Sequence, residues 1–150
     1  MSDATARKRI PIREGLLTSP LSPLEDVMLQ GSKCRNCGEV ALGISSSCQN
    51  CAGEELDVIP LSKDGILWTY TVIRNRPPGD YKGPDPFVPF GEGLVELPEG
   101  IRVKIPLGGD PERLKIDMNM RFHAYKLFED TDGNEVIAFR FDPVQEKKHD

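Results

Sequence analysis

Two closely spaced cysteine pairs constrain this chain more than any other feature of its sequence. Cys34 and Cys37 form one C-x2-C pair, and Cys48 and Cys51 form a second pair after the spacer 38–47. The chain contains no other cysteine. Four thiolates presented by two tight turns complete the ligand set of a tetrahedral structural zinc site, and a doubled C-x2-C is far more specific than a single one. The sequence therefore predicts a four-cysteine metal site.

Other uses of paired cysteines fit this pattern less well. Disulfides are rare in a reducing cytoplasm, and a thioredoxin-like C-x-x-C needs one pair beside a βαβ pattern. All-thiolate sites also accept iron, as rubredoxins do, so a rubredoxin-like electron carrier stays open as an alternative. We favour one structural Zn²⁺, because four ligands close the shell and leave no position for water or substrate.

The charge balance argues against a nucleic-acid partner. The 150 residues include 19 Lys and Arg against 24 Asp and Glu, a formal charge of −5, whereas binding to phosphates depends largely on positive charge. One small basic cluster lies near the start of the chain and is interrupted by Pro11; its members are Arg7, Lys8, Arg9 and Arg13. We expect this segment to be a solvated, mobile arm.

Nothing in the sequence predicts a membrane segment. No apolar run approaches the roughly 18 residues that span a bilayer, and the start of the chain, MSDATARKRIPIR, lacks the apolar core of a signal peptide. We therefore expect a cytoplasmic protein without membrane contact.

The residues after the cysteines follow a β pattern, rich in β-branched and aromatic side chains between turn signals. In GILWTYTVIRN, simple alternation predicts one face with Trp68, Tyr70 and Val72, and an opposite face with Leu67, Thr69, Thr71 and Ile73. Asp110 and Pro111 predict one helical turn. The expected strands are Leu56–Ser62, Gly65–Asn75, Gly93–Leu97, Ile101–Leu107 and a final hairpin that turns at Asp132-Gly133.

About five strands with one short helical turn suit a partly open Greek-key barrel, of which the OB fold is the best candidate. The expected fold is mainly β. A helical or irregular N-terminal docking arm (1–28) precedes a rubredoxin-like zinc ribbon (29–58), a five-stranded OB-fold barrel (59–143) and a polar tail (144–150).

A long proline-rich loop interrupts the strands. RPPGDYKGPDPFVPF, residues 76–90, holds five prolines and two glycines, which exclude a regular strand or helix, and loops of this length in small domains are often functional. Its aromatic side chains either tuck into the core or face a ligand or partner. The candidates for contact with coenzyme A or a partner are Arg74, Arg76, Tyr81, Lys82, Phe87 and Phe90.

No catalytic constellation is visible in the sequence. Of the two histidines, His123 lies in an expected strand and His149 in the tail, and the motifs of nucleophilic hydrolases, phosphate loops and zinc proteases are missing. We therefore assign no catalytic residue, which favours a binding or assembly role.

Several stretches together resemble one known family. LQGSKCRNCGEVALGISSSCQNCAGEELDVIPLSKDGILWTYTVIRNRPP, then PFGEGLVELPEGIRV, then GDPERLKIDMNMRFHAY are similar to the acyl-CoA-associated zinc-ribbon/OB-fold proteins. The likeness covers residues 29–143. Family members usually carry a second turn of the form C-P-x-C-G, where this chain has CQNCAG, and aromatic and proline residues in the spacer, where it has ALGISSS.

The resemblance implies an accessory subunit. Such proteins assemble with thiolases or thiolase-like enzymes of acyl-CoA metabolism, and the expected role is to stabilise that partner and to help bind coenzyme A or the acyl-CoA substrate. Benzoylsuccinyl-CoA of anaerobic aromatic degradation is the substrate that the resemblance suggests. A single-stranded nucleic-acid-binding OB protein is the alternative, with Trp68, Tyr70 and Tyr125 as base-stacking candidates.

Overall fold

The computed structural model describes residues 8–79 and 81–144. Residues 1–7 of the expected arm and 145–150 of the expected tail, including Arg7 and His149, lie outside the described residues. The contacts divide the chain into two compact units. The first extends to Leu61 and includes residues 124–138; the second comprises residues 62–123 and the chain from 139 onward.

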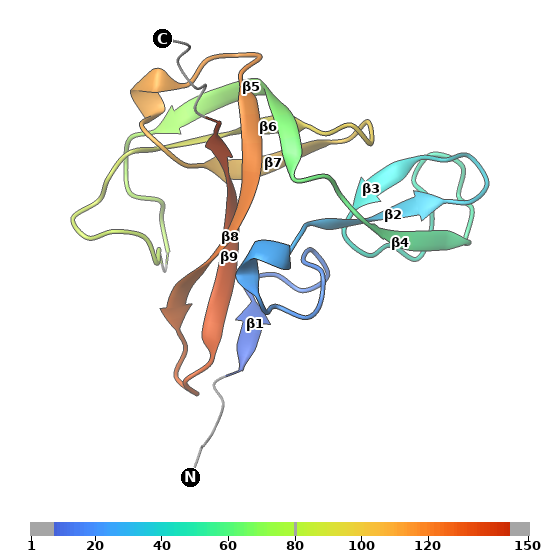
Figure 1. The fold of residues 1–150 in the computed structure, drawn as a ribbon, viewed down its shortest axis with the longest axis horizontal. Coiled ribbons are helices and arrows are strands. Elements are labelled where there is room, and N and C mark those ends of the chain that lie inside the picture. The colour runs from blue at the N-terminus through green and yellow to red at the C-terminus, as the bar shows by residue number, and fades with distance from the viewer. Residues whose placement is uncertain (1–7, 80, 145–150) are drawn as a thin grey trace. The chain divides into compact units, whose positions relative to one another are not determined.

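The cysteine-bearing segment of the first unit forms a three-stranded antiparallel sheet in the order β3-β2-β4 (Figure 1). Strand β2 (Gln30–Cys34) lies between β3 (Val40–Leu42) and β4 (Leu56–Pro60). Its pairing with β3 brings Lys33 opposite Val40, directly beside the first cysteine turn. A short sheet that carries two cysteine turns is consistent with the predicted zinc ribbon.

The N-terminal segment is tied to the rest of its unit. Strand β1 (Arg9–Pro11) pairs in parallel with residues 135–137 of β9, and the 3-10 helix η1 (Leu24–Asp26) follows. The Arg9 guanidinium donates to Glu135 Oε1 at 2.9 Å and to the Leu21 carbonyl at 3.0 Å. The prediction of a solvated, mobile cluster is therefore wrong for Arg9, because these acceptors hold its side chain.

Five strands form a barrel, which confirms the five-stranded OB fold predicted from the sequence (Figure 1); the barrel is closed, whereas the sequence predicted a partly open one. Antiparallel pairing joins β5 to β6, β6 to β7 and β5 to β8, Leu107 of β7 pairs in parallel with Phe141 of β9, and β9 also pairs with β8. The strands are β5 (Asp64–Ile73), β6 (Phe90–Glu96), β7 (Arg102–Leu107), β8 (Asn119–Glu129) and β9 (Glu135–Pro143).

A β-bulge in β5 changes the alternation expected for that strand, so the residues after the bulge face opposite to the side predicted from Leu67. The register with β6 shifts between Leu67 and Thr69, so Trp68 is the extra residue. Leu67 lies opposite Val95, and after the bulge Tyr70 lies opposite Gly93. Because partners across a sheet share a face, Leu67 and Tyr70 both point inward, and the predicted grouping of Trp68 with Tyr70 is wrong.

Two glycines in β6 leave room for the barrel interior. A Cβ on Gly91 would lie 2.5 Å from Leu114 Cδ1, and one on Gly93 would meet the Thr69 carbonyl oxygen. The Tyr70 hydroxyl donates to the Leu114 carbonyl at 2.9 Å. Positions 91 and 93 therefore need glycine, because neighbouring atoms lie too close to β6 for a Cβ at either position.

The predicted helical turn before β8 is confirmed as the 3-10 helix η2 (Pro111–Arg113), with the Asp110 side chain accepting a hydrogen bond from the Glu112 N–H at 3.0 Å. In the part of the chain that the structure describes, neither helical turn is long and apolar enough to cross a membrane.

Candidate metal centre

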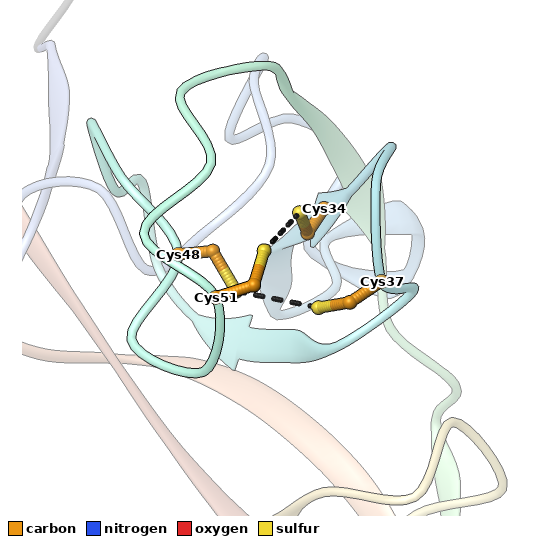
Figure 2. A group of neighbouring side chains, drawn as sticks. All are labelled: Cys34, Cys37, Cys48 and Cys51. Atoms are coloured by element: carbon orange, nitrogen blue, oxygen red, sulfur yellow. Dashed lines mark hydrogen bonds between the residues drawn. The ribbon is translucent and has the colours of Figure 1, made fainter.

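The four cysteine sulfurs gather in one cluster, as Figure 2 shows. All lie within 4.8 Å of one another. The Cys34 and Cys51 sulfurs are 3.6 Å apart, and those of Cys37 and Cys48 are 3.5 Å apart. Each close pair joins one sulfur from each C-x2-C turn, so the two turns present a single set of ligand atoms.

Two short turns with the same hydrogen bonds build this cluster. In the first knuckle (residues 34–39) the Cys34 N–H donates to the Glu39 carbonyl and the Gly38 N–H to the Cys34 carbonyl, both at 2.9 Å. In the second knuckle (residues 48–53) the Cys48 N–H donates to the Gly53 carbonyl and the Ala52 N–H to the Cys48 carbonyl, both at 2.8 Å. Each hydrogen bond of the first knuckle recurs in the second knuckle, fourteen positions further along the chain.

The cluster fits a zinc ion. With Zn–S bonds of about 2.3 Å, the edges of a tetrahedron of sulfurs measure about 3.8 Å, close to the two shorter separations here. Thiolate ligands bind zinc and iron in preference to Mg²⁺ and Ca²⁺, which prefer oxygen ligands. Cys34, Cys37, Cys48 and Cys51 would hold the ion, whose contribution is a cross-link between the knuckles.

Hydrogen-bond donors favour the thiolate form of two of the ligands. The Asn36 side-chain amide and the Gly53 N–H lower the pKa of Cys51 to about 6. The Asn50 amide and the Glu39 N–H likewise lower the pKa of Cys37. Since a metal binds the deprotonated sulfur, these donors prepare both thiols for coordination.

Cys48 has the opposite tendency. The Cys51 N–H lowers its pKa, but burial and the neighbouring Cys37 and Cys51 thiols outweigh that donor and raise the pKa to about 11. A cation must therefore displace the proton from this buried ligand, so metal binding releases protons.

Ser32 supports the cluster from the middle of β2. Its side chain is polar yet buried, only 1% exposed. Its hydroxyl donates to the Gly43 carbonyl at 2.7 Å and accepts from the Ser45 N–H at 3.0 Å. The serine thereby holds the spacer between the knuckles. Sequence reasoning missed it, because an isolated serine in a strand carries no pattern.

The structure brings together four of the six candidates for contact with coenzyme A or a partner. Tyr81, Phe87 and Phe90 gather, with ring centroids 5.7 to 6.3 Å apart, and the Arg76 guanidinium carbon lies 5.5 Å from the centre of the Tyr81 ring. Arg74 instead pairs with Glu112 at 3.1 Å. Lys82 is exposed.

Several named proteins are similar in sequence to most of this chain. The DUF35 domain-containing scaffold protein of Methanothermobacter thermautotrophicus is 32% identical over 118 residues, which cover 77% of this chain and 86% of the relative. The chain belongs to the DUF35 family. This DUF35 chain is also 31% identical over 123 residues to the scaffold protein of Pyrococcus furiosus, over 80% of this chain and 86% of the relative.

Other matches agree with the family and the fold. Residues 58–124 match the family model described as the ChsH2 C-terminal OB-fold domain. The benzoylsuccinyl-CoA thiolase subunit BbsA of Thauera aromatica is 28% identical over 120 residues, 75% of this chain and 74% of the relative. The solved Ltp2-ChsH2(DUF35) aldolase superposes with a TM-score of 0.60 at 22% identity, over 77% of this chain and 84% of that one, which supports the fold.

Proposed function

We propose that this DUF35 chain is a zinc-binding, non-catalytic accessory subunit of an acyl-CoA thiolase, which it stabilises by forming a hetero-oligomer. The observation that carries the proposal is its likeness to a protein described as a thiolase subunit, over three quarters of both chains. Relatives described as scaffold proteins support an assembly role. Benzoylsuccinyl-CoA, the thioester in the name of that thiolase, is the proposed substrate of the complex.

The metal centre has a structural part in this proposal. Four thiolates within 4.8 Å of one another fill a tetrahedral shell, so the ion cross-links the ribbon and leaves no coordination site for a substrate. In a small sheet such as β2–β4, a metal replaces the stability that a larger apolar core would supply.

The proline-rich loop is the proposed contact with coenzyme A or with the partner. Its half-buried rings Tyr81, Phe87 and Phe90 give an apolar face, and Arg76 lies against that face. Guanidinium groups bind phosphate oxygens as two-pronged donors and the lysine ammonium binds them as a point charge, so Arg74, Arg76 and Lys82 are the proposed phosphate contacts.

Co-purification tests the assembly. The tagged chain is co-expressed with a candidate thiolase from the same genome, and the complex is separated by gel filtration and assayed for thiolysis. We expect one hetero-oligomer whose thiolase loses solubility or activity without this chain. If the two proteins elute separately at micromolar concentration and the thiolase is fully active alone, the proposal is wrong.

Two further measurements test the metal and the loop. Elemental analysis of the protein should give one zinc per chain; a red iron–thiolate chromophore would favour the electron-carrier alternative. In the assembled complex, replacing Arg74, Arg76 and Lys82 by Ala should weaken coenzyme A binding at least tenfold, while Arg113→Ala, exposed outside the loop, serves as the control. An unchanged dissociation constant would reject the loop contact.

A further inference from the structure

Each knuckle places an asparagine at the same position, directly before its second cysteine. The sequences are C-R-N-C and C-Q-N-C, which contain Asn36 and Asn50. The backbone N–H of each asparagine donates to the first cysteine sulfur of its own knuckle. The Asn36 nitrogen lies 3.4 Å from Cys34 Sγ, and the Asn50 nitrogen lies 3.3 Å from Cys48 Sγ.

The two side chains instead cross from one knuckle to the other. Asn36 Nδ2 lies 3.4 Å from Cys51 Sγ, and Asn50 Nδ2 lies 3.5 Å from Cys37 Sγ. Each asparagine therefore binds two sulfurs, one of its own knuckle and one of the opposite knuckle. The pair of crossed contacts joins the knuckles from both directions.

The crossed contacts are made to the two ligands nearest to solvent. Cys37 and Cys51 are exposed, whereas Cys34 and Cys48 are buried. The buried sulfurs receive the backbone N–H groups of the two asparagines, and the exposed sulfurs receive their side-chain amides. An exposed thiolate can leave a metal, or meet a reagent from solvent, without disturbing the core.

We propose that Asn36 and Asn50 are positioning residues that cap the exposed ligands of the opposite knuckle, Cys51 and Cys37, and thereby slow loss of the metal and attack on these sulfurs. The inference rests on the proposed metal centre. An N–H donor withdraws charge from a bound thiolate and holds its orientation, and partners of this kind commonly change metal affinity about 10- to 100-fold.

Metal release gives the first test. Zinc-loaded wild type, N36A, N50A and the double variant are mixed with excess chelator, and the release rate is followed by the absorbance of the zinc–chelator complex. Each single variant should release zinc several-fold faster and the double variant about 10- to 100-fold faster. Gln49→Ala, at the exposed position beside Asn50, is the matched control and should release zinc at the wild-type rate.

Crossed reactivity gives the sharper test, because a general loosening of one knuckle would not produce it. Zinc-loaded protein is treated briefly with iodoacetamide, and the modified cysteine is identified by mass spectrometry of peptides. In N36A, Cys51 should gain reactivity several-fold over Cys37; in N50A, Cys37 should gain it over Cys51. Modification that rises instead within the mutated knuckle would overturn the proposal.

Metal content and spectra separate the possible failures. If the wild type binds neither zinc nor cobalt, the proposed metal centre itself is wrong. If the double variant binds one zinc, has the wild-type cobalt–thiolate spectrum, and releases zinc within twofold of the wild-type rate, then the centre stands and the capping role is wrong. The cobalt spectrum also verifies that four sulfurs bind in each variant, so faster release cannot be assigned to a missing ligand.

Discussion

Ala52 adopts the left-handed backbone conformation that Gly38 adopts at the equivalent position of the other knuckle, with φ of 64° and 81° respectively. Their N–H groups donate to the carbonyls of Cys48 and Cys34 at 2.8 and 2.9 Å. The turn geometry therefore demands a positive φ in both knuckles, but only the first knuckle has the residue that takes it without steric cost.

We expect Ala52→Gly to stabilise the protein. The left-handed conformation costs a residue with a Cβ about 1–2 kcal/mol, and the greater entropy of glycine in the unfolded chain offsets part of this gain. The free energy of unfolding, measured by urea titration at a fixed zinc concentration, should rise by about 0.5–1 kcal/mol.

Gly38→Ala is the reciprocal variant. A Cβ at Gly38 would have no neighbour within 4 Å, so only the backbone conformation contributes, and the free energy of unfolding should fall by about 1 kcal/mol. Equal effects of the same sign at the two positions would contradict the equivalence of the knuckles.

The cysteine cluster could be predicted from sequence because each C-x2-C closes a local turn. The spacing alone brings two sulfurs together, and two such turns beside a short strand bring four. The asparagines could have been noticed too, since Asn36 and Asn50 occupy the same position in both pairs. Which sulfur each amide reaches depends on how the knuckles pack, and no local pattern encodes that packing.

The faces of β5 and the pairing of β1 could not be predicted from sequence. Alternation assumes an unbroken register, but the bulge at Trp68 depends on how β5 aligns with β6. Strand β1 has three residues, too few for a period, and its partner Glu135 follows Arg9 by 126 positions. Both features depend on partners distant in the chain.

Gly93→Ala should destabilise the barrel strongly. Its Cβ would meet the Thr69 carbonyl oxygen, a backbone atom that cannot turn aside, and would lie 3.0 Å from Tyr70 Cβ. Overpacking of this kind costs about 1–3 kcal/mol, and we expect the upper end in thermal or urea unfolding. The control is Glu92→Ala, on the outward face between the glycines, which should change stability by less than about 0.5 kcal/mol.

The fluorescence of Trp68 should depend on the contact between its ring and the Arg102 guanidinium. Trp68 is the single tryptophan of the chain, 44% exposed, and the guanidinium carbon of Arg102 lies 3.9 Å from its ring centre. Arg102→Ala should shift the emission maximum to longer wavelength, because water replaces the guanidinium, and should cost about 0.5–1 kcal/mol. Glu96→Gln, which removes the carboxylate 3.2 Å from Arg102 Nε, should leave the emission unchanged if the ring contact is responsible.

Removing the metal should loosen the ribbon and spare the barrel. The ribbon strands β2–β4 belong to the first compact unit, whereas β5, β6 and β7 of the barrel belong to the second. Most residues of β3 and β4 are only partly buried or exposed, so these strands offer little apolar core around the cysteines. After chelation, hydrogen exchange followed by mass spectrometry should rise in residues 31–58 and stay near the wild-type level in β6 and β7. The Cys37→Ser, Cys51→Ser double variant should reproduce this pattern without chelator. Uniform loss of protection would show that the barrel also depends on the ion.

The turn between β8 and β9 should depend on pH through Asp130. This carboxylate accepts from the backbone N–H of Asn134 at 2.8 Å and of Asp132 at 3.0 Å, and the Asn134 N–H foremost holds the pKa of Asp130 below its ordinary value of 3.8. Since the folded state binds the proton more weakly than the unfolded state, the stabilisation is fully present above pH 4–5 and is lost as the pH falls through the lowered pKa.

Asp130→Asn, compared with the wild type by thermal unfolding between pH 6 and pH 2.5, tests this dependence. The variant should be less stable at pH 6, and the difference should shrink as the pH falls below about 4, because protonation then removes the same charge from the wild type. Asp132→Asn, an exposed acid in the same turn, is the control for overall charge. A difference between wild type and Asp130→Asn that stays constant down to pH 2.5 would show that the carboxylate charge does not hold this turn.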